Sequence, residues 1–247
     1  MAPQEPVLLV TGASRGIGAA CARLAGAHGF KVGVNYVRDR RAADEVVGAI
    51  RASGGNAVAI QGDMKAEADI ERVLQTLERE FGRLTHLVYN SGITGAPSRL
   101  EAAKTETLRE VLDLNVLGAL LCVRAAVPRI STKHGGAGGA IVLVSSAAAT
   151  LGSPGEYVWY AASKGAVESM TVGLARELAA DEIRVNAVAP GLIATGIHPP
   201  GRLERMAPAV PMGRAGTAEE VGEAILFLLS DATSYVTGTV LRVAGGR

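Results

Sequence analysis

Short apolar runs alternate along the whole chain with longer stretches whose apolar residues recur every three or four positions. The runs occupy residues 6–10, 31–36, 57–60, 84–90, 140–145, 183–188 and 238–243. Most of them are continuously apolar, which is typical of parallel strands that helices cover on both faces. Helical spacing is clear between the third and fourth runs, at Ile70, Val73, Leu74, Leu77 and Phe81. With right-handed crossovers, the alternation predicts an α/β fold, a doubly wound parallel sheet of about seven strands with helices on both faces.

One irregular segment interrupts this rhythm. The 247 residues contain no fixed-period repeat and no Pro-, Ser- or Gly-rich linker that would separate domains. Residues 190–216, however, hold five of the ten prolines and lie between a predicted strand and the last predicted helix. A long irregular segment in a compact domain is usually a lid or a binding loop. We therefore expect one domain over residues 1–247, with a substrate lid at about residues 191–216.

Composition argues against several classes of function. The formal net charge is only +1, so there is no electrostatic reason to expect nucleic acid or an anionic membrane as a partner. Cys21 and Cys122 lie far apart and the four histidines are scattered, which argues against a metal site and favours two buried thiols in a reducing cytoplasm. No signal peptide is visible, and no window reaches the ~20 uninterrupted apolar residues that a membrane span needs. These observations predict a cytoplasmic protein.

A glycine-rich turn follows the first predicted strand and opens an amphipathic helix. Its sequence, TGASRGIG at residues 11–18, has glycine at positions 12, 16 and 18. Glycine lets the backbone approach a pyrophosphate closely, and the N–H groups and dipole of the helix start favour that anion. The alternative is a strand-to-helix turn without a ligand. The position directly after the first strand favours dinucleotide binding.

The end of the second predicted strand bears on the choice of cofactor. An acidic residue there would accept hydrogen bonds from the adenosine ribose of NAD and would repel the 2′-phosphate of NADP. No acid occurs before Asp39, whereas Arg38 stands at the strand end and Arg15 within the glycine-rich turn. Two such cations could both contact a phosphate. The alternative is that both are solvated surface arginines. The sequence therefore favours NADP over NAD.

Tyr160 and Lys164 are spaced i, i+4 in the sequence YAASK, so they project from the same face of a predicted helix. An ammonium near a phenol lowers the tyrosine pKa from its usual ~10 toward the range useful for proton transfer. The alternative is a simple contact on the helix surface. The fifth predicted strand ends near Ser146, at the sheet edge where such folds bind ligands, so its hydroxyl could hydrogen-bond a substrate carbonyl beside the tyrosine.

Further polar and small residues are expected at the same edge of the sheet. Asn115 lies inside an otherwise apolar helical run and needs either a polar partner or a surface position, because asparagine is a poor mid-helix residue. Asn90 and Gly92 close the fourth predicted strand, where a bend of small residues lets the backbone approach a dinucleotide. Pro190-Gly191 follows the sixth strand.

In order and spacing, these motifs resemble those of the short-chain dehydrogenase/reductase family, in its 3-oxoacyl-reductase-like or glucose-dehydrogenase-like branch. The family's turn is T-G-x-x-x-G-x-G, as at residues 11–18. The resemblance implies a Rossmann-type fold, hydride exchange between NAD(P) and an alcohol/carbonyl pair, and a catalytic tetrad at Asn115, Ser146, Tyr160 and Lys164. Tyr160 would exchange a proton with the carbonyl oxygen, which Ser146 would hold. Lys164 would lower the tyrosine pKa and bind the nicotinamide ribose, while Asn115 would order a water in the proton relay.

The resemblance also implies which residues contact the cofactor and how subunits associate. The implied cofactor contacts are Gly12, Ser14, Arg15, Gly16, Ile17, Gly18, Asn35, Tyr36, Arg38, Asp63, Met64, Asn90, Gly92, Tyr160, Lys164, Pro190, Gly191, Ile193 and Thr195. Asp63 and the Met64 backbone would contact adenine, and residues 191–195 the nicotinamide half. A homotetramer would form through the helices that hold Asn115 and Tyr160, together with the last strand.

The sequence departs from the family's pattern at several positions. Tyr89 stands where a second asparagine is frequent and Ser91 where alanine is, which alters the adenosine-side wall. The interval from Ser146 to Tyr160 is one residue longer than in many members, which leaves Ser145 as an alternative catalytic serine. Ala244 stands where an aspartate is common, close to expected subunit contacts.

The substrate is constrained mainly by the lid. The expected pocket wall in the lid consists of Ile197, His198, Pro199, Met206 and Met212. Few charges occur in the first half of the lid, which favours a neutral carbonyl or alcohol compound, although Arg202 and Arg205 leave an anionic substrate open. Tyr157 and Trp159 could face either the substrate or a neighbouring subunit.

Two other functions share this fold. A non-catalytic dinucleotide-binding sensor or scaffold is the main alternative, because a fold alone does not determine function. An intact tetrad argues against it, since a sensor has no use for a proton donor. An epimerase or dehydratase with bound NAD fits less well, because such enzymes usually add a substrate domain for which 247 residues leave no room.

Overall fold

The computed structural model describes residues 5–196 and 201–247 and contains one seven-stranded sheet. Its strands are β1 (Val7–Val10), β2 (Lys31–Tyr36), β3 (Asn56–Gln61), β4 (His86–Tyr89), β5 (Gly139–Val144), β6 (Ile183–Pro190) and β7 (Val240–Val243). All neighbouring pairs are parallel, in the order β3-β2-β1-β4-β5-β6-β7. The doubly wound α/β sheet expected from the apolar runs is thus confirmed.

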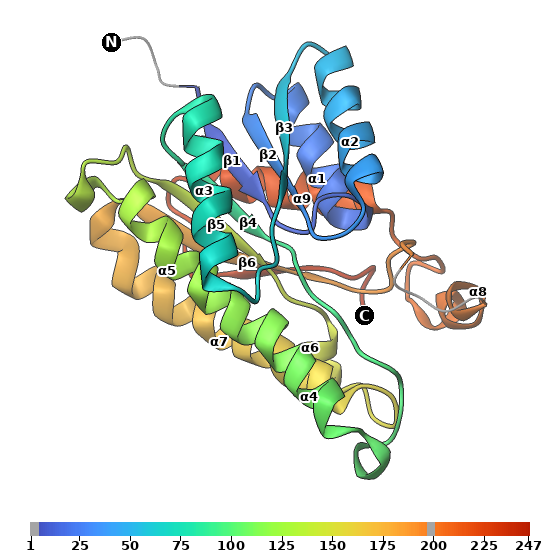
Figure 1. The fold of residues 1–247 in the computed structure, drawn as a ribbon. Helices are drawn as coiled ribbons and strands as arrows, with labels where there is room; N and C mark the ends of the chain where they lie inside the picture. Colours follow the sequence, from blue (N-terminus) through green and yellow to red (C-terminus); the bar gives the residue numbers. More distant parts are fainter. Residues whose placement is uncertain (1–4, 197–200) are drawn as a thin grey trace.

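Helices cover both faces of the sheet (Figure 1). One face carries α1 (Gly16–Ala27), α2 (Arg40–Ala52) and α9 (Ala218–Leu229), and the other carries α3 (Glu67–Phe81), α5 (Gly118–Ile130) and α7 (Val158–Leu178). Each set packs its apolar side chains against the strands as a separate buried cluster. Because both faces are covered, the central strands are apolar throughout, as in β1, where all four residues are buried.

Several strand boundaries differ from those expected from the apolar runs. The run at residues 84–90 contains only the four-residue β4, because the Thr85 hydroxyl and the Asn90 amide bond to neighbouring segments outside the ladder. The last strand begins at Val240 rather than at residue 238, where Gly238 has a positive φ of 79°. In contrast, β6 extends to Pro190, which pairs with Val243 at the end of the sheet.

The helix before β5 has a widened turn at its centre. It consists of α4 (Thr105–Leu112), a π-helical turn (Asp113–Leu117) and α5, and it is long and apolar enough by composition to cross a membrane, as core helices of soluble proteins also are. Here it lies on the sheet beside α3 and α7. A π-helical turn is rare and is frequent at functional sites.

The order of strands reverses between β1 and β4, so the first two crossovers lead to one side of β1 and the later strands are added on the other. At such a point the carboxyl ends of neighbouring strands diverge and leave a crevice for a ligand. The glycine-rich turn after β1, Asn90 after β4 and Ser146 after β5 all lie at this edge. The short helices α6 (Ala148–Leu151) and α8 (Arg202–Met206) follow β5 and β6 at the same edge, and α8 stands apart from the layered body in Figure 1.

Candidate active site

The glycine-rich turn adopts a backbone that only glycine allows without strain. Gly12 and Gly16 have positive φ angles of 60° and 56°, in the left-handed region that disfavours other residues. Gly18 begins the buried side of α1, and a Cβ there would lie 2.6 Å from both the Gly12 carbonyl and the Asn90 side-chain nitrogen. The cradle therefore remains open only because side chains are absent. This is the geometry that a bound pyrophosphate requires.

Two side-chain amides, the buried one of Asn35 and the half-buried one of Asn90, hold the turn in place. Asn35 is fully buried, accepts a hydrogen bond from the Gly12 N–H at 3.1 Å and donates to the Gly62 carbonyl at 3.0 Å. Asn90 donates from its side chain to the carbonyls of Thr11 and Gly12, at 3.0 and 3.1 Å. The structure thus gives the Asn35 side chain a positioning contact with the turn. The buried side chain of Tyr36 packs in the core, so only the backbone of these two β2 residues remains for a ligand.

The arginines at the adenosine end are exposed. Arg15 precedes α1 as its N-cap residue, and Arg38 lies just beyond β2. Within residues 5–196 and 201–247, neither guanidinium forms an ion pair or a hydrogen bond with another residue. Both charges are therefore available to an anionic group. On the opposite wall, Asp63 caps its own turn by accepting from the Lys65 N–H at 3.0 Å, and the Met64 side chain is buried.

Tyr160 and Lys164 lie one turn apart on α7, as their spacing predicts. The Lys164 ammonium is 5.8 Å from the centre of the Tyr160 ring and donates to the Val144 carbonyl at the end of β5, at 2.6 Å. The Ser146 hydroxyl, just after β5, lies near enough to the Tyr160 hydroxyl to lower the phenol pKa. Ser145, in contrast, is buried and donates to Glu168 at 3.0 Å, away from the phenol. The geometry favours Ser146 over Ser145 as the partner of Tyr160.

The pKa values around the phenol differ from the expectation. Burial raises the pKa of Tyr160, and the nearby Ser146 hydroxyl only partly opposes this effect. Burial also lowers the pKa of Lys164 to about 8, because the low-dielectric interior disfavours the ammonium. The expectation that Lys164 lowers the pKa of Tyr160 is therefore not met in the cofactor-free protein. The i, i+4 spacing could not reveal that Lys164 is buried, that Tyr160 is half-buried and that the ammonium bonds to a backbone carbonyl.

Asn115 lies in the π-helical turn and is almost completely buried. Its side chain accepts from the Ile93 N–H and donates to the Ile93 carbonyl, both at 2.9 Å, and it also donates to the Ser163 hydroxyl at 3.0 Å. Ser163 in turn donates to the Tyr160 carbonyl at 2.7 Å. Asn115 thus has the polar partners that its place in an apolar helix requires, and it connects the segment after β4 to the helix of Tyr160.

Gly92 lies where these groups meet. A Cβ at this position would lie 3.3 Å from the Asn115 side-chain oxygen and 3.4 Å from the Lys164 ammonium. At the other end of the crevice, a Cβ on Gly16 would lie 3.5 Å from the Thr195 side chain, so the segment after β6 reaches across to the glycine-rich turn. The crevice from Gly16 to Gly92 therefore has the open backbone, the helix start and the terminal polar groups that an extended dinucleotide needs.

The segment after β6 is joined to the body at a few points. At its base, the Ala194 N–H donates to the Gly216 carbonyl at 2.8 Å and the Gly216 N–H to the Leu192 carbonyl at 2.9 Å. Arg202 of α8 forms two hydrogen bonds with Glu156, of 2.7 and 2.6 Å, and lies over the Tyr157 ring. Arg202 is thus neutralised by a residue four positions before Tyr160.

The expected pocket wall is only partly described. Ile197, His198 and Pro199 lie outside the described residues. Of the others, Met206 is half-buried in α8, and Met212 is exposed. Tyr157 and Trp159 are both buried against each other with ring centres 6.4 Å apart, and the Trp159 indole donates to the Thr94 carbonyl at 2.8 Å, so in this chain they pack internally.

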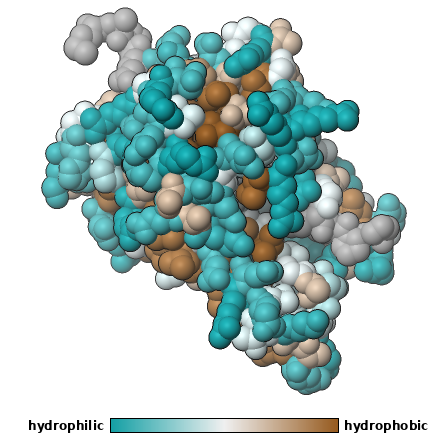
Figure 2. Space-filling model, viewed as in Figure 1, coloured by the Kyte–Doolittle hydropathy of each residue, from teal (hydrophilic) through white to brown (hydrophobic). Residues whose placement is uncertain are grey.

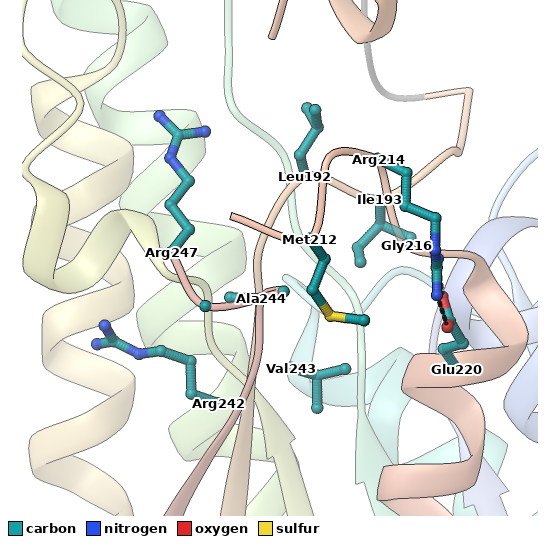
Figure 3. Close-up of a pocket in the computed structure, with 12 residues that line it drawn as sticks. Leu192, Ile193, Met212, Arg214, Gly216, Glu220, Arg242, Val243, Ala244 and Arg247 are labelled. Atoms are coloured by element: carbon teal, nitrogen blue, oxygen red, sulfur yellow. Dashed lines mark hydrogen bonds and ion pairs between the residues drawn. The ribbon is translucent and has the colours of Figure 1, made fainter. Parts of the chain in front are cut away.

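A cavity of about 550 Å³ opens beside this segment, next to the end of β7. Figure 3 shows Met212 projecting toward it, with the Arg214–Glu220 ion pair on one side and Arg242 and Arg247 on the other. It shares Ile193 with the predicted cofactor contacts, but no member of the tetrad, all of which the structure describes, lines it. This cavity adjoins the site and is not its catalytic centre.

Two contributors to the site were not expected from the sequence. Ser163 links Asn115 to the backbone of Tyr160, and Glu156 holds Arg202. The only signal for Ser163 was its place beside Lys164 in YAASK, three residues after Tyr160. Nothing in the sequence pairs Glu156 with Arg202, which lies 46 residues away.

The chain is similar along nearly its whole length to known proteins. A family model described as enoyl-(acyl carrier protein) reductase matches residues 12–247. The uncharacterized oxidoreductase YgfF of Escherichia coli is 47% identical over 245 residues, which cover 98% of this chain and 99% of that protein. The 3-oxoacyl-[acyl-carrier-protein] reductase of Synechocystis is 41% identical, over 97% of this chain and 96% of that protein. A short chain dehydrogenase from Burkholderia cenocepacia, solved in complex with NADP, is 33% identical with a TM-score of 0.91 over 98% of each chain.

Proposed function

The chain belongs to the short-chain dehydrogenase/reductase family of oxidoreductases, and we propose that it interconverts a secondary alcohol and a ketone or aldehyde with NADP(H), using Tyr160 as general acid and base. The observation that carries this proposal is the convergence of Tyr160, Ser146, Lys164 and Asn115 beside the space that Gly92 leaves open. A dinucleotide-binding scaffold would not need a phenol held beside a serine and a buried lysine.

The residues present fit a nicotinamide dinucleotide, which supplies or accepts the hydride when bound. Tyr160 gives its proton to the carbonyl oxygen on reduction and removes it on oxidation, while Ser146 donates a hydrogen bond to the same oxygen. Burial raises the pKa of the Tyr160 phenol, which favours its role as the proton donor in reduction. Lys164 binds the nicotinamide ribose and returns a proton to Tyr160, and Asn115 holds the Ile93 backbone and a relay water in place.

The test is the exchange of Tyr160 for phenylalanine, which removes the transferable proton and keeps the ring. We expect Tyr160→Phe to lower kcat by about 10²–10⁴-fold, the usual range for general acid–base catalysis, with little change in the Kd for NADPH. NADPH oxidation on a panel of ketones, sugars and sterols identifies a substrate, and NADPH fluorescence gives the Kd. Undiminished turnover by Tyr160→Phe would overturn the assignment.

The preference for NADP over NAD is supported by the exposed Arg15 and Arg38 and by the absence of an acid at the end of β2. Arg38→Asp introduces an acceptor for the ribose hydroxyls and a charge that repels the 2′-phosphate. We expect the ratio of kcat/KM for NADPH to that for NADH to fall by at least about tenfold, in keeping with the strength of charge-assisted phosphate contacts. Arg79→Asp on the surface of α3 is the control. A lower KM for NADH than for NADPH in the unchanged protein would contradict the proposal.

A neutral carbonyl compound is the substrate class that the lid supports. Of the two lid arginines that could have attracted an anion, Arg202 is already paired with Glu156. Residues 191–216 are proposed as the lid. The segment is joined at its base, and the Arg202–Glu156 pair places it beside Tyr160. The lid is part of one proposed domain that spans residues 1–247.

A homotetramer in the cytoplasm is the proposed assembly and location. Exposed apolar side chains interrupt the outer faces of the helices that carry the tetrad, at Leu112, Leu117, Leu120, Val158 and Val172. Figure 2 shows hydrophobic patches of this kind within an otherwise hydrophilic surface on the face viewed in Figure 1. The location is supported by Cys21 and Cys122, which are buried free thiols.

A further inference from the structure

Tyr89, the last residue of β4, forms a contact that the proposed chemistry does not use. Its side chain is 3% exposed, and its hydroxyl donates to the Leu114 carbonyl at 2.6 Å. Leu114 lies in the π-helical turn immediately before Asn115. The contact thus joins the end of a sheet strand to the one turn of this helix whose geometry is irregular.

The packing around this hydroxyl is close. A Cβ on Gly118, the first residue of α5, would lie 2.6 Å from the Tyr89 hydroxyl oxygen and 2.6 Å from the Met64 carbonyl. Glycine at this position therefore makes room for the phenol to reach the turn. Burial raises the pKa of Tyr89 well above its usual value, so the group remains a neutral donor over the working pH range.

The orientation of Asn115 depends on the same turn. Its amide makes three hydrogen bonds, two to the Ile93 backbone and one to Ser163, and these require the amide to face the segment after β4. The alternative to a π-helical turn is a regular α-helical turn that holds one residue fewer. That change would rotate every later side chain about the helix axis by about 100°. A contact that holds the Leu114 carbonyl in the widened register therefore holds Asn115 as well.

We propose that Tyr89 is a positioning residue for Asn115: its hydroxyl fixes the π-helical turn through the Leu114 carbonyl and so keeps the Asn115 amide on Ile93. The inference rests on the proposed function, in which Asn115 belongs to the proton relay. The end of β4 then serves both halves of the site, because Asn90 holds the glycine-rich turn and Tyr89 holds the turn of Asn115.

The first test needs no substrate. Tyr89→Phe removes the donor and keeps the buried ring. Thr171→Val on α7 is the control, because it removes a different buried hydroxyl, which donates to the Val167 carbonyl at 2.8 Å. We expect amide hydrogen exchange at Ile93, whose N–H donates to Asn115, to accelerate by about tenfold in Tyr89→Phe beyond what its loss of global stability explains. In Thr171→Val, exchange at Ile93 should follow global stability alone. The same behaviour in both variants would overturn the inference.

The second test is a double-mutant cycle on kcat, with the carbonyl compound identified by the panel. We expect Tyr89→Phe to lower kcat by about tenfold, as removal of an orienting partner does, without a comparable change in the KM for NADPH. In the Asn115→Ala background, Tyr89→Phe should have little further effect, because residues that act through one another are not additive. An equal effect in both backgrounds would reject the positioning role and leave the proposed function standing. An unchanged kcat in Asn115→Ala alone would instead remove Asn115 from the proposed relay, and the inference with it.

Discussion

The floor of the site and its lid are built in different ways. In the floor, the turn after β1 and the groups around Tyr160 are held by buried amides and hydroxyls, such as Asn35 and Asn115, which bond to backbone atoms of other segments. Among the described residues of the proposed lid, contacts to the rest of the protein include the Arg202–Glu156 and Arg214–Glu220 ion pairs and the Met212 N–H, which donates to the Gly245 carbonyl at 3.1 Å. The Asn35 and Asn115 side chains of the floor are themselves buried, whereas Glu156, the partner of Arg202, is 40% exposed.

This difference separates two tasks. Buried hydrogen bonds to backbone are costly to break, because the remaining partner stays unsatisfied in a low-dielectric interior. Partly exposed ion pairs contribute much less free energy to stability than such buried hydrogen bonds. We therefore expect the floor to present the cofactor and the proton donor in one fixed geometry, and the ion pairs of the proposed lid to break at a lower cost in free energy. Substitutions in the floor should affect folding, cofactor binding and chemistry together, whereas those in the part of the lid beyond Thr195 should affect mainly substrate binding.

The largest effect is expected for Gly18→Ala in the floor. The new Cβ would lie 2.6 Å from the Gly12 carbonyl and from the Asn90 amide, so the turn must shift, at a cost of about 1–3 kcal/mol of unfolding free energy for overpacking. We expect the Kd for NADPH to rise by about 100-fold or more, because the turn is the pyrophosphate cradle. Fluorescence titration and thermal unfolding measure the two effects.

Gly48→Ala is the matched control for this substitution. Gly48 lies on the exposed side of α2, where a Cβ would meet no atom within 4 Å, so alanine should be neutral or stabilising by up to about 1 kcal/mol. Equal behaviour of the two variants would contradict the view that the turn is sterically closed to side chains.

A second effect concerns the buried ammonium of Lys164. Its pKa is lowered to about 8 in the folded protein, against about 10.4 in an unfolded chain. Between these pH values the unfolded chain holds a proton that the folded protein has released, so the free energy of unfolding rises with pH. Relative to Lys164→Met, the unchanged protein should therefore gain stability from pH 7 to pH 9.5, by at most about 1.4 kcal/mol for each pH unit above 8.

Urea unfolding of the cofactor-free proteins at pH 7, 8.5 and 9.5 measures this gain. The range ends below the raised pKa of Tyr160, so that the phenol does not contribute. Parallel stability curves for the two proteins would show that Lys164 is not buried as an isolated charge, and the floor would then be less dry than its hydrogen bonds indicate.

The smallest effect is expected in the lid. Glu156→Gln removes the charge that holds Arg202, a pair whose side chains are 40% and 15% exposed. Partly exposed pairs contribute about 0.2–1 kcal/mol, so we expect the KM for the carbonyl substrate to rise by about 1.5–5-fold, with the Kd for NADPH unchanged.

Glu45→Gln, which breaks the exposed Arg41–Glu45 pair on α2, is the control and should alter neither constant. A parallel rise in the Kd for NADPH in Glu156→Gln would refute the separation of lid and floor, because it would show that the ion pair also supports the cofactor.

The sequence determines the floor more clearly than the lid. Apolar runs are enough to predict the strands, and helical spacing is enough to place Tyr160 and Lys164 on one face, because both patterns are local. Partners that are distant in the chain leave no such pattern: Asn115 and Ser163 lie 48 residues apart, and Tyr89 and Leu114 lie 25 apart. The direction of the Tyr160 pKa also needed the structure, because it depends on how far the surrounding segments exclude water.

The backbone bridge between Ile193 and Gly216 has an evolutionary consequence. Because the lid is closed on itself at its base, its interior can be lengthened, shortened or exchanged as a cassette without altering the register of β6 or the start of α9. A replacement that begins beyond Thr195, the last predicted cofactor contact, changes the wall that faces the substrate and keeps the predicted redox machinery. Grafting the corresponding interval of a relative between Thr195 and Gly216 is accordingly a direct route to engineered selectivity.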